Sequence, residues 1–413
     1  MSSTGILPTS LLDTDLYKFT MQQAVLRHFP DVQATYRFTH RDKDVPFTRE
    51  CVDTFRESVS KFGSLRLTDE EYAWLKTTCP YFNDEYLQYL RQYRFKPEQV
   101  SVRFLPLDEN PTLGHLEIEA VGPWLETILW EVPLMACLSE LYFKFVDTDW
   151  NYDGQEEQAY AKAEDLVKAG CAFSEFGTRR RRSCRTQDTV IRGLVRASKE
   201  FPGPGKLTGT SNVHLAHVHG LSPVGTIAHE WFMGIGALKG YEHANGTALA
   251  LWEEVYPDAL QLALTDTFST EVFYKDFIAN PERARRWKGL RQDSGDPFIY
   301  APRAKEVYES LGINHREKII IFSDALSVEK AKKLKAQCDE VGFTASFGIG
   351  TTFTNDFKKV SSGGKEKSKA LNMVIKLAAV DGKPCVKISD ELTKNTGDTA
   401  IVKLVKEIYH LPL

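Results

Sequence analysis

The sequence contains no Cys-x-x-Cys motif, and its cysteines are few and widely spaced. There are seven of them, an odd number, among 413 residues. A chain of this length can bury a large core without disulfide bonds. Scattered cysteines are typical of proteins from a reducing compartment. We therefore expect free thiols and a cytoplasmic location, with the nucleus as a second compartment.

Signals for secretion and for membrane insertion are also absent. Residues 1–10 have neither a basic start nor an apolar run, so we expect no signal peptide. The most apolar segment, 124–145, contains Glu126, Glu131, Glu140 and Pro133. These residues make it too polar to cross a bilayer. We expect a soluble protein with no membrane partner.

The chain also lacks an excess of positive charge, because its formal net charge is -4 at pH 7. Binding to a nucleic-acid backbone normally requires a broad basic face, so we expect no nucleic-acid partner. The exception is local, the run Arg179-Arg180-Arg181-Arg182. Such a run usually forms a solvated helix face. Four consecutive arginines point in several directions around a helix, however, so one or two could face inward.

Residues 1–150 mix predicted helices and strands. The segment 11–21 has the pattern of a helix start, with Asp13 or Thr14 available to accept the first free backbone N–H groups. The sequence Thr68-Asp69-Glu70-Glu71 is a capping-box pattern. We expect an N-terminal α+β domain over this range. Its predicted strands are 32–39, 100–105 and 116–120.

From residue 151 to about 360, helical segments alternate with short apolar strands that end in polar or glycine residues. This alternation favours a parallel sheet covered by helices. About seven such units indicate an irregular (β/α) barrel, whose strand ends carry the active site at one mouth. A doubly wound open sheet is the rival topology. The predicted strands are 171–173, 206–208, 223–224, 260–264, 289–290, 319–322 and 343–347.

The last segment, 361–413, is expected to pack on the N-terminal domain. Residues 361–367 are predicted to form a mobile linker because they are rich in Ser and Gly. Two apolar runs, 374–380 and 384–388, flank Asp381-Gly382-Lys383, which is a hairpin signal. The fold class is therefore α/β, an irregular barrel plus an N-terminal α+β sandwich-like domain that this hairpin completes.

Three kinds of polar residue collect at the predicted mouth. Arginines and glycine-rich turns bind phosphate oxygens, since guanidinium donates paired hydrogen bonds and glycine lets backbone N–H groups approach. Carboxylates suit Mg²⁺ and sugar hydroxyls. A histidine here can be a nucleophile, a base, a ligand or a core residue. These residues are Arg179, Arg291, Gly348, Gly350, Asp266, Asp293, Asp296, Asp324 and His229.

Each feature also has a plainer interpretation. The glycines of 347–350 can end a strand for steric reasons, and Asp324 can cap the following helix. Asp293 and Asp296 could form the carboxylate pair of a glycosidase. A glycosidase, however, does not need so many phosphate-binding elements. A phosphorylated sugar accounts for the arginines, the glycines and the carboxylates together.

The order of these motifs resembles the nicotinate phosphoribosyltransferase family, which is a type II phosphoribosyltransferase family. The resemblance covers nearly the whole chain, and the ordered series is far more specific than any one motif. The matching segments are 11–18, 174–182, 209–212, 225–231, 291–297 and 347–351.

The resemblance implies synthesis of nicotinate mononucleotide from nicotinate and phosphoribosyl pyrophosphate, in NAD biosynthesis. ATP hydrolysis would be coupled to it through a phosphorylated His229, with Asp266 orienting the imidazole. Asp293 would contact the ribose and phosphates and is a candidate Mg²⁺ contact. In this family Tyr17 would come from the other subunit, which implies a homodimer with a shared active site. The remaining substrate contacts implied are Phe176 against the pyridine ring, Arg179 near its acid group, Arg291 at the ribose and phosphates, and Gly348, Gly350 and Thr351 at the 5′-phosphate.

The choice between the acid and the amide substrate depends on Ser211. The related nicotinamide phosphoribosyltransferase has an acidic residue at this position, and a carboxylate there would repel nicotinate. Ser211 with Arg179 favours nicotinate. Two alternatives stay open at this point: use of nicotinamide, and a non-catalytic RNA-binding α/β barrel that uses the arginine run.

Overall fold

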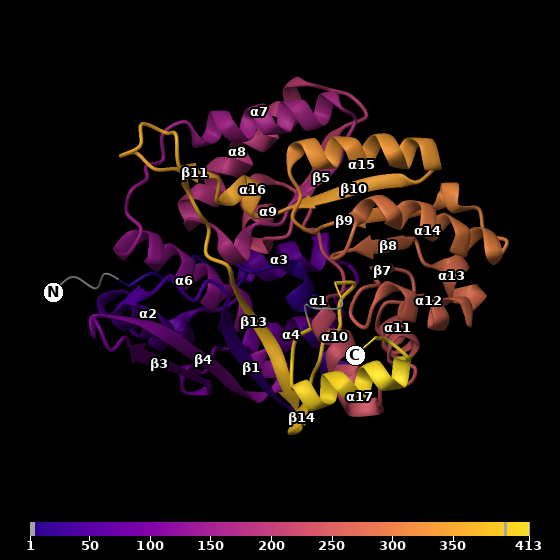
Figure 1. The fold of residues 1–413 in the computed structure, drawn as a ribbon, viewed down its shortest axis with the longest axis horizontal. Coiled ribbons are helices and arrows are strands. Elements are labelled where there is room, and N and C mark those ends of the chain that lie inside the picture. Colours follow the sequence, from indigo (N-terminus) through magenta and orange to yellow (C-terminus); the bar gives the residue numbers. More distant parts are fainter. Residues whose placement is uncertain (1–4, 392–394, 413) are drawn as a thin grey trace.

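The structure is a computed structural model that describes residues 5–391 and 395–412. It contains two six-stranded sheets. The sheet built from both ends of the chain lies in the lower half of Figure 1, and the sheet of the middle of the chain lies above it. A third, two-stranded sheet joins β11 (Phe357–Lys358) to β12 (Lys367–Ser368).

The first sheet is antiparallel and has the order β14-β13-β1-β4-β2, with β3 paired to β4. Strand β13 pairs with β1, so the C-terminal hairpin completes the N-terminal sheet as predicted. Asp381 and Gly382 have φ of 46° and 73°, which suits a tight two-residue hairpin turn. The return strand is shorter than expected. The strands are β1 (Gln33–His40), β2 (Phe47–Thr48), β3 (Val100–Pro106), β4 (Leu113–Pro123), β13 (Met373–Val380) and β14 (Lys383–Pro384).

The start of the first helix differs from the prediction. Helix α1 begins at Leu16, and its N-cap residue is Asp15, whose side chain makes no capping bond. The predicted cap Asp13 instead accepts hydrogen bonds from the Arg181 guanidinium at 2.7 and 2.8 Å. The other predicted cap, Thr14, has a buried hydroxyl without a hydrogen-bond partner. A tertiary ion pair thus takes the carboxylate that local sequence assigned to the cap.

The predicted capping box is confirmed in α3. The Thr68 hydroxyl accepts from the backbone N–H of Glu71, and the Glu71 carboxylate accepts from that of Thr68. The helices of this part are α1 (Leu16–His28), α2 (Arg49–Ser60), α3 (Asp69–Thr78), α4 (Asp84–Gln92), α5 (Trp124–Thr127) and α6 (Glu131–Phe145), with short 3-10 turns at Phe62–Ser64 and Pro97–Gln99.

The second sheet is parallel and has the order β6-β5-β10-β9-β8-β7. Because β5 pairs with both β6 and β10, the strands follow the cyclic order of a (β/α) barrel. The predicted third strand at 223–224 is wrong, since this segment forms only an isolated bridge between Thr210 and Pro223. Among the described residues β6 and β7 are therefore edges. The six strands are β5 (Ala172–Glu175), β6 (Lys206–Thr210), β7 (Leu262–Leu264), β8 (Gly289–Gln292), β9 (Ile319–Phe322) and β10 (Thr344–Ile349).

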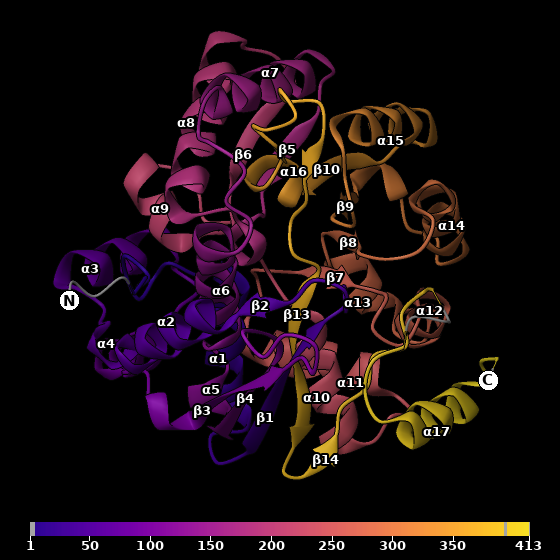
Figure 2. The same ribbon diagram turned by 60° about the vertical axis from the view of Figure 1, so that its left-hand side comes forward.

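Helices surround the parallel sheet, with α7 and α15 on the outer side in both ribbon views (Figures 1 and 2). Among the described residues, no helix has the length and apolar character needed to cross a membrane. All seven cysteines are free, and six are buried. The remaining helices are α7 (Gln155–Lys168), α8 (Cys184–Glu200), α9 (Val213–His219), α10 (His229–Lys239), α11 (Ala244–Val255), α12 (Thr270–Ile278), α13 (Pro281–Arg286), α14 (Pro297–Ser310), α15 (Val328–Val341), α16 (Thr351–Thr354) and α17 (Thr399–Tyr409), with short 3-10 turns at Thr178–Arg180 and His315–Glu317.

The segment predicted as a linker, 361–367, is a hairpin loop instead. It closes the two-stranded pair of β11 and β12. The backbone N–H of Lys359 donates to the carbonyl of Glu366 at 2.9 Å. From this hairpin the chain runs into β13, which brings residues near the C-terminus back to the mouth of the parallel sheet (Figure 2).

Candidate active site

His229 is the first residue of α10 and lies at the mouth of the parallel sheet. Its Nε2 is 2.8 Å from Oδ1 of Asp266, which follows β7. A carboxylate only accepts, so Nε2 carries the proton and Nδ1 keeps its lone pair. Burial lowers the pKa of His229 in spite of the carboxylate, which favours a neutral imidazole. This histidine has the protonation state of a nucleophile.

Asp266 is itself held by donors on its second oxygen. Its Oδ2 accepts from Lys387 Nζ at 3.0 Å and from the Ser294 hydroxyl at 2.6 Å. Burial alone would raise the pKa of Asp266, but His229 and Lys387 outweigh it and hold that pKa well below its usual range. The carboxylate is therefore ionised and fixes the orientation of the imidazole.

Asp293 and Arg291 also lie close to His229. Oδ2 of Asp293 is 3.8 Å from His229 Nε2, and its Oδ1 is 3.3 Å from Arg291 Nη2. Ser323 bridges the pair, since it accepts from Arg291 Nε at 2.9 Å and donates to Asp293. A negative and a positive group are thus fixed side by side within reach of the histidine.

These residues open into one cavity of about 230 Å³. Arg179, Arg291, His229 and Asp293 all line it, so the strand ends do converge as the sequence predicted. Asp266 lies behind the histidine rather than in the cavity wall. The cavity wall also includes Tyr17, Glu131 and Glu230, and three cations that the sequence did not identify, Arg41, Lys376 and Lys387.

The three additional cations make this cavity strongly basic. Burial, together with the nearby positive charges of Lys387, Arg41 and Arg179, lowers the pKa of Lys376 to about 8. Several neighbouring cations that have lost their water are stabilised most by a ligand with several negative charges. In the sequence, Lys376 is one polar residue in a predicted strand. Only the pairing of β13 with β1 shows that it faces the mouth of the other sheet.

A second, smaller cavity of about 80 Å³ adjoins the first. Tyr17, Arg179 and Arg291 line both cavities, and Phe176 lines the smaller one. Tyr17 and Phe176 belong here to the same chain. In this chain α1 places Tyr17 on the wall of the same cavity as Phe176, and a contribution of Tyr17 from another subunit stays a prediction.

The glycine at 348 is explained by packing against Phe176. A Cβ added to Gly348 would lie 2.3 Å from Cδ2 of the Phe176 ring, which is far closer than carbon atoms approach. The glycine thus makes room for the aromatic ring at the small cavity. Its predicted contact with the 5′-phosphate stays a prediction.

The small cavity contains a carboxyl group close to Ser211. The Ser211 hydroxyl donates to Oδ1 of Asp15 at 2.7 Å. Burial raises the pKa of Asp15, and the Arg179 charge offsets this only in part. Because the serine proton is already used, Arg179 and Arg291 are the cations of this cavity that an anionic ligand would meet. Asp15 was not among the predicted site residues.

The arginine run divides into cavity residues and structural residues. Arg179 lines both cavities, whereas Arg181 is buried against Asp13. Arg182 is fully buried, with its guanidinium 3.5 Å from the Phe143 ring centroid. The usual interpretation of a solvated helix face is wrong for these residues. The RNA-binding alternative loses the basic surface on which it depended.

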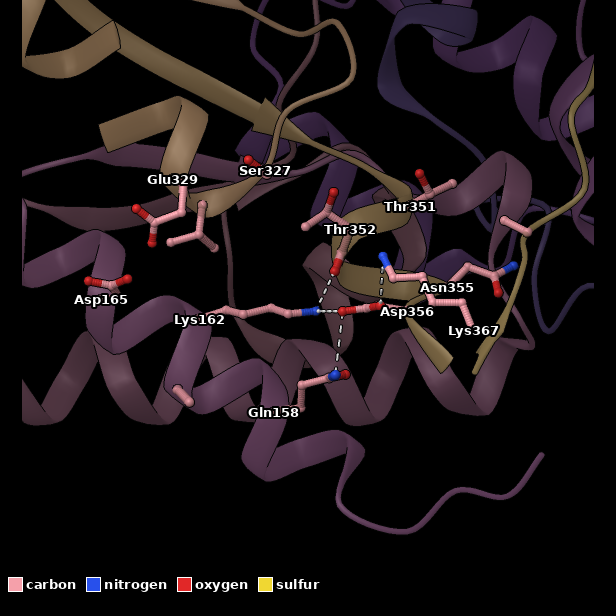
Figure 3. A pocket seen from close by; sticks show the side chains of 13 residues that line it. Gln158, Lys162, Asp165, Ser327, Glu329, Thr351, Thr352, Asn355, Asp356 and Lys367 are labelled. Atoms are coloured by element: carbon pink, nitrogen blue, oxygen red, sulfur yellow. Dashed lines mark hydrogen bonds and ion pairs between the residues drawn. The ribbon is translucent and has the colours of Figure 1, made fainter. Parts of the chain in front are cut away.

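Gly350 and Thr351 line neither cavity; Thr351 lies on the wall of a separate groove of about 590 Å³. The groove runs along α7, α16 and the start of α15 (Figure 3). At its floor, Lys162 Nζ donates to the Thr352 carbonyl at 2.6 Å and to Asp356 at 2.7 Å (Figure 3). These bonds hold the short helix α16 that follows Gly350. The bonds of Lys162 therefore support the glycine loop, residues 347–350, from the α7 side.

Comparison with known proteins agrees with this arrangement. The chain matches the model of the nicotinate phosphoribosyltransferase (NAPRTase) N-terminal domain over residues 12–139 and that of the NAPRTase family over residues 171–413. It is 44% identical to a probable nicotinate phosphoribosyltransferase of Schizosaccharomyces pombe, over 98% of each chain. It is 45% identical to the nicotinate phosphoribosyltransferase of Saccharomyces cerevisiae, over 96% of this chain and 94% of that one.

Solved structures give the same result. The nicotinate phosphoribosyltransferase of Porphyromonas gingivalis superposes with a TM-score of 0.89 at 38% identity, over 97% of this chain and 99% of that one. The two family models together span both sheets and the cavities between them. The chain belongs to the nicotinate phosphoribosyltransferase family.

Proposed function

We propose that the protein transfers the phosphoribosyl group of phosphoribosyl pyrophosphate to nicotinate, forming nicotinate mononucleotide and pyrophosphate in NAD biosynthesis. Family membership supports this reaction. The observation that carries it is the pair of adjoining cavities: a small one with two aromatic residues and an arginine, and a larger one lined by cations. A flat acid and a polyphosphate would occupy them side by side.

The chemistry needs positioning and charge more than proton transfer. Tyr17 and Phe176 would hold the pyridine ring, and Arg179 its carboxylate. The pyridine nitrogen carries no proton, so no general base is required at the bond-forming step. Arg41, Lys376 and Lys387 would stabilise the pyrophosphate that leaves as positive charge develops on the ribose.

A second part of the proposal is that ATP phosphorylates His229. Asp266 keeps the proton on Nε2, so Nδ1 is free to attack a phosphoryl group. As the first residue of α10, His229 also lies where a helix N-terminus favours negative charge. The phosphorylated histidine would face the same cations that hold pyrophosphate, which offers a route for coupling the two reactions.

The residues at the mouth also fit Mg²⁺. This ion is usually held by one or two carboxylates together with substrate phosphates. Asp293 fits that role, because its Oδ2 faces the cavity and makes no closer described contact than the 3.8 Å approach of His229. Mg²⁺ bound there would neutralise charge on the phosphates and help to orient them.

The assembly and the location of the protein are separate proposals. We keep a homodimer with a shared active site as the expected assembly; the family resemblance supports it, and within one chain Tyr17 and Phe176 already line the same cavity. Size-exclusion chromatography with light scattering tests it. The cytoplasm is the expected location, and the nucleus is the second compartment.

The test is a comparison of the two pyridine substrates. Purified protein with phosphoribosyl pyrophosphate, ATP and Mg²⁺ should convert nicotinate to its mononucleotide and leave nicotinamide essentially unreacted. Arg179→Gln should raise KM for nicotinate, because the carboxylate loses its cation, by about tenfold or more. Equal use of nicotinamide, or no product from either substrate, would overturn the proposal.

A further inference from the structure

Lys18 is a buried cation with no exposed surface. In α1 it follows Tyr17, which lines both cavities. Its ammonium forms ion pairs with two carboxylates, that of Glu131 at 2.5 Å and that of Glu230. Two ion pairs on one fully buried lysine cost desolvation energy, so they are not expected where packing alone would serve.

Each of the two carboxylates is attached to a different part of the site. Oε1 of Glu131, the first residue of α6, lies 3.2 Å from Nη1 of Arg179, the proposed partner of the nicotinate carboxylate. Glu230 directly follows His229 in α10. Lys18 therefore connects Arg179, which would bind the nicotinate carboxylate, with the start of α10, where His229 would carry the phosphoryl group.

The Glu230 end of this bridge is rigid. The Tyr36 hydroxyl and Trp124 Nε1 both donate to its Oε1, the latter at 3.0 Å, while Lys18 binds Oε2. The Glu131 end can change, because Arg179 is the group that a bound acid would also engage. A carboxylate ligand at Arg179 would weaken its bond to Glu131 and leave that charge to Lys18.

We infer that Lys18 is a positioning residue that couples the nicotinate pocket to His229 through Glu131 and Glu230. The inference rests on the proposed function, in which both sites work in one cycle. Lys18 touches no substrate in this arrangement. Lys18 divides its charge between Glu131 and Glu230. A ligand on Arg179 that weakens the Arg179–Glu131 bond would therefore change how strongly Lys18 binds Glu230, the residue after His229.

Lys18→Met is the direct test. Without the ammonium, Glu131 binds Arg179 alone and competes with nicotinate for the guanidinium, so the Kd of nicotinate should rise about tenfold by calorimetry. His229 keeps Asp266, so its labelling by γ-³²P-ATP alone should stay within about threefold of wild type. The acceleration of label loss by nicotinate and phosphoribosyl pyrophosphate, measured at saturating nicotinate, should disappear.

Glu230→Gln separates the coupling from the binding. The amide oxygen can still accept from Tyr36 and Trp124, but the charge that Lys18 pairs with is gone. Nicotinate should bind at least as tightly as to wild type, because the whole charge of Lys18 then falls to Glu131, which competes less with nicotinate for Arg179. The acceleration of label loss should nevertheless fall about fivefold or more. This variant decides the inference if Lys18→Met does not fold.

A buried lysine elsewhere is the matched control. Lys318 Nζ donates to three backbone carbonyls, those of Ala284, Arg285 and Trp287, at the starts of β8 and β9, whereas the site lies at the ends of these strands. Lys318→Met should lower the unfolding temperature without changing nicotinate affinity or coupling. The inference is overturned if folded Lys18→Met and Glu230→Gln couple like wild type, or if the control loses coupling equally. Absence of label on wild-type protein would instead contradict the ATP proposal, and the nicotinate Kd would still test the Arg179 half of the bridge.

Discussion

The histidine at the centre of the site owes its protonation state to two residues that are close in space but distant in sequence. Asp266 fixes the tautomer of His229, and Lys387 helps to keep Asp266 charged although it is buried. The lysine comes from the C-terminal segment and the aspartate from the end of β7. The proposed nucleophile thus depends on a contact between the C-terminal segment and the parallel sheet.

Asp266→Asn should slow phosphorylation of His229. The amide can occupy the same place but does not require the proton on Nε2, so the nucleophilic tautomer is no longer enforced. Loss of such an orienting carboxylate costs about 10- to 100-fold in comparable sites. The measurement is the initial rate of acid-labile labelling by γ-³²P-ATP.

Asp188→Asn is the control for this change. Asp188 also lies 2.8 Å from a histidine Nε2, that of His219, on the surface of α8 and α9. Removing this carboxylate should leave the labelling rate unchanged. Equal rates for wild type and Asp266→Asn would show that the carboxylate does not orient the nucleophile.

Lys376 should make binding of phosphoribosyl pyrophosphate depend on pH. Burial lowers the pKa of this lysine to about 8, so it is positive below that pH and neutral above it. Affinity is therefore highest below pH 8 and falls as the pH rises through 8, by about tenfold at most for a single charge. Calorimetry between pH 7.5 and 9.5 measures it.

Lys376→Met gives the reference for this prediction. It should bind phosphoribosyl pyrophosphate more weakly at pH 7.5 and show little change up to pH 9.5, since the titrating group is gone. A wild-type affinity that stays constant over the same range would mean that Lys376 does not face the polyphosphate.

Among the elements, those governed by local rules could be predicted from sequence. The capping box of α3 depends on Thr68 and Glu71 alone, and the tight turn at Asp381 and Gly382 fixes the hairpin. The third barrel strand was predicted wrongly, because Pro223 offers no N–H and the segment makes only a bridge. The alternation of polar and apolar residues does not show whether a segment pairs with a neighbouring strand.

The brace behind the glycine loop is an element-scale device. Lys162 of α7 holds the carbonyl of Thr352 in α16, and Asn355 donates from there to the Arg180 carbonyl at 2.7 Å. The Lys162 bonds drawn in Figure 3, together with the bond from Asn355 to Arg180, therefore connect α7 through α16 to the segment that carries the arginine run. A small shift of α16 would therefore also move Gly350 and Thr351.

Lys162→Met should raise KM for phosphoribosyl pyrophosphate by about three- to tenfold, because the loop proposed for its 5′-phosphate loses a fixed anchor. The KM of nicotinate should change less. Lys168→Met on the same helix, where the lysine pairs with Glu164 and lies over the Phe201 ring, is the silent control. An unchanged KM for phosphoribosyl pyrophosphate in a folded Lys162→Met protein would show that the Lys162 bonds do not support the proposed 5′-phosphate site.

At the scale of the whole molecule, the active site forms where two sheets from distant parts of the chain meet. The sequence predicted the residues at the ends of the parallel strands, such as Arg291 and Asp293, because strand ends of one sheet share an edge. It did not predict Arg41 or Lys376. These belong to the other sheet, and no spacing rule relates them to the strand ends.

The same architecture places the start of α1 at the site. Helix α1 starts beside β6, since the N–H of Leu16 donates to the Ser211 carbonyl at 2.8 Å. This contact brings Tyr17 to Phe176 within the chain. The family resemblance suggested a second subunit at this point. The route of the first helix could be established only from the structure.

The most direct test of the central claim is labelling with γ-³²P-ATP followed by addition of the two other substrates. The account predicts an acid-labile label on His229 that is absent from His229→Ala, and that is lost quickly when nicotinate and phosphoribosyl pyrophosphate are added together. Label on another residue, or label on His229 that the two substrates do not discharge, would contradict it.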